Sequence, residues 1–511
     1  MSTRRISSVC HVGGIAIGGD NPIRIQSMAT TDTNDTEASV AQAKRIIDAG
    51  GELVRFTTQG TREAENMKNI SARLKADGYT QPLVADVHFT AHTADIAAQY
   101  CEKVRINPGN YVDPGRTFKH LEYTDEEYQA ELQKIEAKLV PFINICKEHH
   151  TAVRIGVNHG SLSDRIMSRY GDTPEGIVES CMEFLRIFRR EQFDDVVISI
   201  KASNTVVMVT TVRLLVKTMD QEDMHYPLHL GVTEAGEGED GRIKSAVGIG
   251  ALLTEGIGDT IRVSLSEEPE CEIPVARKLV ELIPECTRLR QEAEASIKDD
   301  TITLKLAVSS LPLAISQQPT ARSAEGRLLP TGRKNSQQLD DWETLQLKAA
   351  MSVGALLIDR KATKLQLAFS NWPLASQEPI ARSAEGRLLP TGRKNSQKIE
   401  SLADAILQAA RIKFTKTEYI SCPGCGRTLY NLQDTIRRIK AATSHLVGLK
   451  IGIMGCIVNG PGEMADADYG YVGAGRGKIS LYRGKECVLK NIPEAEAVDK
   501  LLELINNDQK Q

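Results

Sequence analysis

Ala-Val-Arg-Ile-Gly-Val-Asn, at residues 152–158, is a short apolar run that contains one arginine and ends on an asparagine. A run of this length between polar segments is typical of a buried strand. The first half of the chain contains seven more such runs, at residues 23–28, 53–58, 83–89, 103–107, 196–202, 228–233 and 260–265.

Helical periodicity separates most of these runs. In residues 175–190, apolar side chains recur on one helical face at Ile177, Val178, Cys181, Leu185 and Phe188. Eight alternating strands and helices over roughly 250 residues predict an α/β fold of the TIM barrel type, which we place at residues 1–290.

The predicted strands end on charged and polar residues, where the catalytic groups of such barrels lie. Their cations are Arg55, Arg105, Arg154, Lys201 and Arg262, and other polar groups are Asp86, His88, Asn158, Glu234 and Ser264. Cations that point into one mouth repel each other unless an anion lies between them. Guanidinium groups bind phosphate oxygens bidentately, so the set predicts a phosphorylated or diphosphate substrate. For any single arginine, a salt bridge between strands is the alternative. Asp86 and His88 either act in catalysis or hydrogen-bond the strand tips together.

Three cysteines lie in loops rich in glycine and proline, within Cys422-Pro-Gly-Cys425 and Gly-Cys456-Ile-Val-Asn-Gly-Pro-Gly-Glu463. Structural zinc usually takes four protein ligands, commonly from two Cys-x-x-Cys pairs, and the chain has no second pair. Soft thiolates also bind iron–sulfur clusters. Three cysteines on a four-iron cluster leave one iron for a weaker ligand, for which Glu463 is the nearest candidate. Zinc or a redox pair remains the alternative.

Both cysteine loops resemble those of the 4-hydroxy-3-methylbut-2-enyl diphosphate synthase family. The continuation Met464-Ala-Asp-Ala-Asp-Tyr-Gly-Tyr-Val-Gly473 is similar to the plant, chlamydial and Bacteroidetes branch, whose members carry an extra middle domain. The resemblance covers residues 1–290 and 400–495. It implies a C-terminal α/β domain like that of sulfite and nitrite reductases at residues 406–511. In that domain a 4Fe-4S cluster would be bound by Cys422, Cys425, Cys456 and Glu463.

Barrel motifs such as Arg105-Ile-Asn-Pro-Gly109 and Arg154-Ile-Gly-Val-Asn158 resemble the same family. The resemblance implies that a cyclic diphosphate is bound by Arg55, Arg105, Arg154, Asn158, Lys201, Arg262 and Ser264. The expected reaction is the reductive ring opening and dehydration of 2-C-methyl-D-erythritol 2,4-cyclodiphosphate to 4-hydroxy-3-methylbut-2-enyl diphosphate, in non-mevalonate isoprenoid biosynthesis. The residues expected to act in catalysis are Glu463, Lys201, Asp86 and His88.

The same resemblance implies a ferredoxin or flavodoxin as electron donor. Because substrate and cluster must meet, the C-terminal domain should cap a barrel, either its own or that of a second subunit in a homodimer. Two other functions stay open: a zinc-stapled anion-binding module, and a protein like sulfite or nitrite reductase with a siroheme partner.

The middle region, residues 291–405, contains two near-identical copies of one segment, at residues 316–337 and 376–397. Solenoid repeats normally occur at least three times, so this pair indicates a recent duplication of an inserted segment. Each copy is basic and polar, which favours disorder or an extended loop. Residues 346–359 between the copies predict a helix running into a strand. We therefore expect an irregular middle insert, much shorter than the extra domain of the longer enzymes.

Composition is that of an ordinary globular protein, with 25% charged residues and a formal net charge of -4 over 511 residues. It indicates no nucleic-acid partner, and no apolar run is long enough to span a bilayer. Apart from the loops above, the cysteines are scattered, unlike those of a secreted disulfide-rich protein. These features predict a cytoplasmic, bacterial protein.

Overall fold

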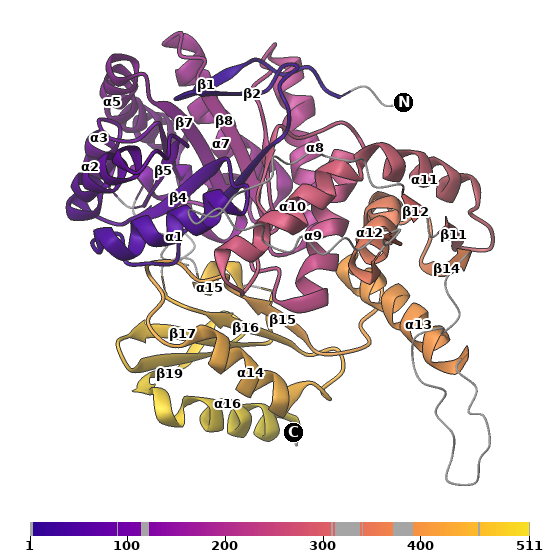
Figure 1. The fold of residues 1–511 in the computed structure, drawn as a ribbon. Coiled ribbons are helices and arrows are strands. Elements are labelled where there is room, and N and C mark those ends of the chain that lie inside the picture. The colour runs from indigo at the N-terminus through magenta and orange to yellow at the C-terminus, as the bar shows by residue number, and fades with distance from the viewer. Residues whose placement is uncertain are drawn as a thin grey trace, which may run out of the picture.

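The computed structural model describes residues 4–88, 90–113, 122–307, 310–311, 338–339, 341–370, 392–457, 460–464 and 466–509. Three parts follow one another along the chain. A barrel comes first, a middle region packs on its side, and a C-terminal α/β domain covers one end of the barrel (Figure 1).

The barrel is a parallel sheet with the strand order β8-β7-β6-β5-β4-β3-β10-β9. Its strands are β3 (Arg24–Met28), β4 (Leu53–Thr58), β5 (Leu83–Val87), β6 (Lys103–Ile106), β7 (Ala152–Asn158), β8 (Val196–Lys201), β9 (His229–Leu230) and β10 (Thr260–Ile261). A parallel bridge between Ile198 and Leu228 joins the two ends of this order. The predicted TIM barrel is therefore confirmed.

Strands β9 and β10 are shorter than the apolar runs that predicted them. After β9 the chain leaves the barrel wall, because Glu234 adopts a left-handed backbone with φ 49° and Ala235 pairs with Ser421 of the C-terminal domain. The backbone after β9 therefore turns toward the C-terminal domain instead of extending the strand.

Within the described residues, one main helix follows each barrel strand. These helices are α1 (Thr36–Asp48), α2 (Thr61–Ala76), α3 (Ala91–Ala97), α5 (Asp125–His149), α7 (Pro174–Arg190), α8 (Thr205–Gln221), α9 (Gly238–Leu253) and α10 (Glu272–Glu281). Helix α7 buries the apolar face predicted from its sequence. Shorter helices lie in the loops at α4 (Pro108–Tyr111), η1 (His159–Ser161), α6 (Asp164–Tyr170) and η2 (Pro269–Cys271), and α11 (Ile283–Ala295) follows α10.

An N-terminal hairpin of β1 (Cys10–Val12) and β2 (Ile15–Ile17) packs against the amino ends of the barrel strands. Its buried residues form one apolar cluster with Leu53, Val84, Ala152 and Val197. In Figure 1 the hairpin lies at the end of the barrel opposite the C-terminal domain. The carboxyl end is thus the end at which a site can form.

The middle region contains regular structure in its described parts. Strands β11 (Thr301–Ala307) and β14 (Lys364–Ser370) form a parallel pair, and β12 (Ser310–Leu311) pairs with β13 (Gln338–Leu339). Helix α12 (Trp342–Ile358) lies between β13 and β14 along the chain, and α13 (Gly392–Ala409) follows β14. The expectation of an irregular insert is corrected for these segments, because α12 is buried on all sides and joins the core of the barrel. No described helix is both long and apolar enough to cross a membrane.

The predicted helix within residues 346–359 is confirmed as part of α12, but the strand begins later, at Lys364. Arg360, with a left-handed φ of 56°, turns the chain between them. The first repeat copy, residues 316–337, and residues 376–391 of the second lie outside the described residues. Residues 392–397 of the second copy form the first turns of α13 instead of the expected loop.

The C-terminal domain, here called the cap, is a five-stranded sheet in the order β15-β16-β17-β18-β19. Its elements are β15 (Glu418–Ser421), α14 (Leu432–Thr443), β16 (Lys450–Met454), α15 (Gly460–Glu463), β17 (Tyr469–Gly475), β18 (Lys478–Arg483), β19 (Glu486–Pro493) and α16 (Glu494–Gln509). It has a core of its own, centred on Ile436, Ile453, Tyr471 and Leu501. The predicted C-terminal α/β domain is confirmed.

Candidate active site

The cap lies on the carboxyl end of the barrel of the same chain. Ser203 Oγ, just beyond β8, donates to the carbonyl oxygen of Glu463 at 3.0 Å. Thr233 Oγ1 donates to Glu463 Oε2 at 2.8 Å, and Ser266 Oγ donates to the carbonyl oxygen of Cys422 at 2.9 Å. The cap therefore contacts the barrel through the same loops that carry its cysteines and Glu463.

A cavity of about 90 Å³ lies between barrel and cap. All the predicted substrate residues line it, namely Arg55, Arg105, Arg154, Asn158, Lys201, Arg262 and Ser264, as do Asp86, His88, Cys422, Cys425 and Cys456. Glu463 is 4% exposed and reaches this region through its contact with Thr233. The structure thus brings the two predicted groups, from parts of the chain far apart, to one place.

Two of the barrel arginines are already paired with protein groups. Arg262 donates to Glu272 through Nε at 3.0 Å and Nη2 at 2.9 Å. Arg105 Nη1 donates to Asp86 Oδ1 at 3.1 Å and Nη2 to the Gly156 carbonyl oxygen at 2.7 Å. The salt-bridge alternative therefore holds for these two guanidinium groups and, more loosely, for Arg55, whose Nε lies 3.8 Å from Asp86 Oδ2. Arg154 and Lys201 are left as the main source of uncompensated positive charge.

Arg154 and Lys201 are surrounded by other cations of the barrel. Within the described part of the chain, Arg154 Nε and Nη1 have no hydrogen-bond partner. Burial lowers the pKa of both side chains well below the usual value, and the positive charge of Arg55 lowers it further. Lys201 lies against Gly231, where an added Cβ would come 2.8 Å from Nζ. An anion in the cavity would relieve this repulsion.

Asp86 and His88 connect the strand tips. Burial alone would raise the pKa of Asp86, but Arg55, Arg105 and His88 together hold it well below its usual range. Burial, and then the positive charge of Arg427, lower the pKa of His88 to about 3, so its imidazole is neutral. His88 Nε2 lies 2.9 Å from Arg105 Nη1. These contacts orient Arg105, and a direct catalytic role for Asp86 or His88 stays a prediction.

The cysteine loops follow two neighbouring parallel strands, β15 and β16, so their carboxyl ends bring Cys422, Cys425 and Cys456 to one edge. The Gly424 amide donates to Cys422 Sγ at 3.2 Å. Burial and the two neighbouring thiols raise the pKa of Cys422. All ten cysteines lie in the described residues, and none forms a disulfide.

The donor set fits an iron–sulfur cluster in its chemistry. Three thiols line one cavity, a backbone amide points at a sulfur as it does in such clusters, and the carboxyl group of Glu463 lies close by as a candidate fourth ligand. Among the described residues, no three His, Cys, Asp or Glu side chains stand close enough together to hold a single metal ion.

Three residues at the site lay outside the predicted set. Glu234 lies beside Glu463, and burial raises the pKa of both carboxyl groups. Glu272 neutralises Arg262 from helix α10, and Arg427 enters the cavity from the cap. Glu234 stood out among the strand ends, and Arg427 lies two residues after Cys425. Glu272 had no signal in the sequence.

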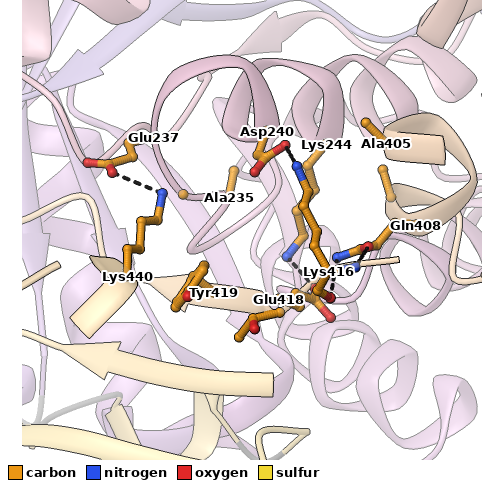
Figure 2. Close-up of a pocket in the computed structure, with 13 residues that line it drawn as sticks. Ala235, Glu237, Asp240, Lys244, Ala405, Gln408, Lys416, Glu418, Tyr419 and Lys440 are labelled. Carbon is orange, nitrogen blue, oxygen red and sulfur yellow. Dashed lines mark hydrogen bonds and ion pairs between the residues drawn. The ribbon is translucent and has the colours of Figure 1, made fainter. Parts of the chain in front are cut away.

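Figure 2 shows a second, smaller cavity of about 40 Å³, where α9 and the loop before it face the cap. Three ion pairs cross this junction. Glu237 pairs with Lys440 at 2.9 Å, Lys244 with Glu418 at 3.1 Å, and Asp240 with Lys416. We call these six residues the junction ion pairs. They hold the cap to the barrel away from the larger cavity.

The fold and site define a class of protein: an α/β barrel with a mouth lined by cations, beneath a cap bearing three thiols. Residues 7–277 match the family model described as the GcpE TIM-barrel domain, and residues 418–507 match that of the GcpE protein C-terminal domain. The chain belongs to the 4-hydroxy-3-methylbut-2-en-1-yl diphosphate synthase family, as its curated relatives show.

A relative from Bacteroides fragilis, named 4-hydroxy-3-methylbut-2-en-1-yl diphosphate synthase (flavodoxin), is 54% identical over 98% of this chain and 96% of its own length. Relatives with the same name are 47% identical in Porphyromonas gingivalis, over 99% of this chain and 98% of theirs, and 39% identical in Protochlamydia amoebophila, over 98% and 96%. The first alignment runs over 598 positions, more than the 511 residues of this chain, so that relative has residues that this chain lacks. The predicted family is confirmed.

Proposed function

We propose that this chain reduces 2-C-methyl-D-erythritol 2,4-cyclodiphosphate, opening the ring and releasing water to give 4-hydroxy-3-methylbut-2-enyl diphosphate. The observation that carries the proposal is the single cavity lined by barrel cations and cap cysteines. Membership in the family makes the chain an oxidoreductase of isoprenoid biosynthesis. It also favours this function over the zinc-stapled module and the sulfite-reductase-like protein.

We propose that Arg154 and Lys201 provide the main attraction for the substrate diphosphate, with Arg55, Asn158 and Ser264 beside them. Cations in a buried cavity stabilise the negative charge that grows on the diphosphate as its bond to carbon breaks. Arg105 and Arg262 are held by Asp86 and Glu272. These two arginines therefore serve mainly to shape the cavity and to present fixed N–H groups to the anion.

Cys422, Cys425, Cys456 and Glu463 would hold a 4Fe-4S cluster, which when bound supplies electrons one at a time. Glu463 is anchored by Thr233 and lies beside Glu234 at the junction of cap and barrel. Departure of water from the substrate consumes a proton. Glu234 is suitably placed to supply it, because this carboxyl group is buried and lines the cavity.

Flavodoxin is the proposed electron donor, since the relatives carry it in their names, and ferredoxin is the alternative. We further propose a cytoplasmic bacterial protein with three parts at residues 1–290, 291–405 and 406–511. Helices α11 and α13 end at Ala295 and Ala409, which supports moving both boundaries a few residues later. A homodimer stays a prediction.

The test is the iron and acid-labile sulfide content of anaerobically purified protein, together with its turnover of the cyclic diphosphate with reduced flavodoxin. We expect roughly four of each per chain, lost in Cys425→Ser because a hydroxyl is a poor iron ligand. Cys487→Ser, a change in the cap but outside the cavity, is the matched control and should keep both. Protein that holds zinc without sulfide, or that does not turn over the substrate, would overturn the proposal.

A further inference from the structure

Lys103 is a buried lysine that the proposed function does not use. It lies on β6, two residues before Arg105, and alternate residues of a strand face the same side of a sheet. Because Arg105 lines the cavity, Lys103 points into the barrel one level below the cavity. Its side chain is fully buried, and within the described residues its Nζ has no hydrogen-bond partner.

Two other polar side chains point into the barrel below the cavity. Gln26 lies two residues before Met28, which lines the cavity, and both amide atoms of Gln26 are buried without a hydrogen-bond partner in the described part of the chain. Nε2 of His229 is buried and unpartnered in the same way. Burial, and then the positive charge of Lys201, lower the pKa of His229 well below its usual value, so its imidazole is neutral. Barrel interiors are usually filled by branched apolar side chains, so packing alone does not explain this polar set.

The surroundings of Lys103 consist of apolar groups and cations. Its register neighbours are Val84 on β5 and Ala152 on β7, and both belong to the apolar cluster that the N-terminal hairpin covers. The cations that act on it are Arg55 on β4 and Arg154 on β7. The carboxylates on the surrounding strands and loops are each paired with another group, namely Glu52, Asp86, Glu102, Asp195 and Asp259.

The protonation state of Lys103 therefore depends on the charge in the cavity above it. Burial, and then the positive charge of Arg154, lower the pKa of Lys103 to about 7. The hairpin contributes the thiol of Cys10, which is neutral because burial raises its pKa. A buried lysine without a partner favours its neutral form, whereas a nearby anion favours the charged form. In the free protein the neutral amine spares Arg154 a second positive charge, and an anion bound at Arg154 removes this restriction.

We propose that Lys103 takes up a proton from solvent when the diphosphate binds, and that the ammonium then stabilises the bound anion from below Arg154. The inference rests on the proposed function, which places the diphosphate at Arg154 and Lys201. Lys103 does not contact the substrate in this arrangement, so it is a positioning residue that acts through its charge. Because the bound form holds more protons than the free form, binding should weaken as the pH rises above about 7.

Isothermal titration calorimetry measures this proton uptake, because the observed enthalpy of binding then depends on the ionisation enthalpy of the buffer. Inorganic diphosphate and the cyclic diphosphate are titrated separately into the anaerobic, cluster-loaded full chain at about pH 8, where the free lysine is mostly neutral. We expect Lys103→Met to take up at least about half a proton less than the wild type. Taking this difference removes the protons bound by the ligand and by other side chains. The matched control is Lys305→Met, at an exposed position of β11, which should behave as the wild type does.

The pH dependence of the dissociation constant supplies a second readout. At about pH 7 we expect the wild type to bind diphosphate about 5- to 50-fold more tightly than Lys103→Met, because only the wild type gains a charge beneath the anion. This advantage should shrink toward about pH 9, where the lysine of the bound form also loses its proton.

Equal proton uptake by the wild type and Lys103→Met would overturn the inference, because a lysine with a merely structural role does not change this number. Lys103→Arg is permanently charged and should also lack the additional uptake. If Lys103→Met does not fold, uptake by Lys103→Arg equal to that of the wild type would overturn the inference, as would a wild type that takes up no proton. Uptake that depends on Lys103 with inorganic diphosphate, without binding of the cyclic diphosphate, would instead support the inference and contradict the proposed function.

Discussion

Lys103 is a buried cation that no described group compensates. It lies at the start of β6, at the amino end of the barrel, and its Nζ has no hydrogen-bond partner within the described residues. Burial lowers the pKa of Lys103 to about 7, and the positive charge of Arg154 adds to this effect. Barrel interiors are usually filled by branched apolar side chains, so this lysine destabilises the fold whenever it is charged.

The destabilisation by Lys103 depends on pH in a defined window. The pKa of lysine in an unfolded chain is about 10.4. Between pH 7 and that value the unfolded chain binds one more proton than the folded protein, so the free energy of unfolding rises with pH. In the wild type this lysine should make the free energy of unfolding, measured with urea, rise by about 1.4 kcal/mol per pH unit between pH 7 and 10. We expect Lys103→Met to lack this rise. Lys305→Met, at an exposed strand position, should keep the wild-type slope. Equal slopes in wild type and Lys103→Met would contradict the buried-charge interpretation.

The strand-end cations and the cysteines could be predicted because parallel strands bring their carboxyl ends to one edge. Arg154 and Lys201 lie where this rule puts them. The charges that neutralise other arginines could not be predicted in the same way. Glu272 reaches Arg262 from the first turn of α10, and nothing in the spacing of the sequence distinguishes it from a solvent-exposed helix residue.

Two short elements, η1 of the barrel and α15 of the cap, are in direct backbone-to-backbone contact, with no side chain between them. An added Cβ at Gly160 would overlap the carbonyl carbon of Gly462, and one at Gly462 would overlap the carbonyl oxygen of Gly160. Helix α15 ends at Glu463. The contact between glycines therefore sets how deeply Glu463 enters the barrel mouth.

Gly160→Ala should move α15 away from the barrel and weaken the contacts of Glu463 with Ser203 and Thr233. We expect turnover to fall about 100-fold, because small displacements of catalytic groups cost this much. Iron content should stay near the wild-type value, since Gly160 lies on the barrel and the three cysteines are unchanged. Gly14→Ala is the control, because its added methyl group meets open space. Wild-type turnover in Gly160→Ala would show that this contact does not position Glu463.

The elements that escaped prediction include two very short strands. Strands β1 and β2 contain three residues each, too few to show an alternating pattern. Helix α12 was predicted within residues 346–359, but its burial on all sides was not, because Gln346 and Lys348 are polar and only packing on α9 and the barrel core buries them. Long amphipathic helices such as α7 were predictable because one face is buried and the other is not.

At the scale of the whole molecule, the chain path favours a cap on its own barrel. Helix α13 joins the barrel core and ends at Ala409, and β15 of the cap begins at Glu418. In Figure 1, α13 runs beside the barrel toward the cap. The junction ion pairs lie where the chain passes from barrel to cap (Figure 2). One of their three lysines lies on the barrel and two lie on the cap, each paired with a carboxylate of the other domain. A short link and matched charges together define the position of the cap.

Mixing two inactive variants tests this arrangement. Cys425→Ser should disable the cap but leave the barrel intact, and Lys201→Ala should disable the barrel but leave the cap intact. If each cap serves the barrel of its own chain, every active site in the mixture lacks one component, because no chain carries both an intact cap and an intact barrel. We therefore expect the turnover of the mixture to equal the mean of the separate variants, even after unfolding and refolding together. A mixture of wild type with either variant gives the turnover expected when half of the active sites are intact. Recovery of turnover in the mixed variants would show that caps close on partner barrels, and the short link from α13 to β15 would then have to open in the assembled enzyme.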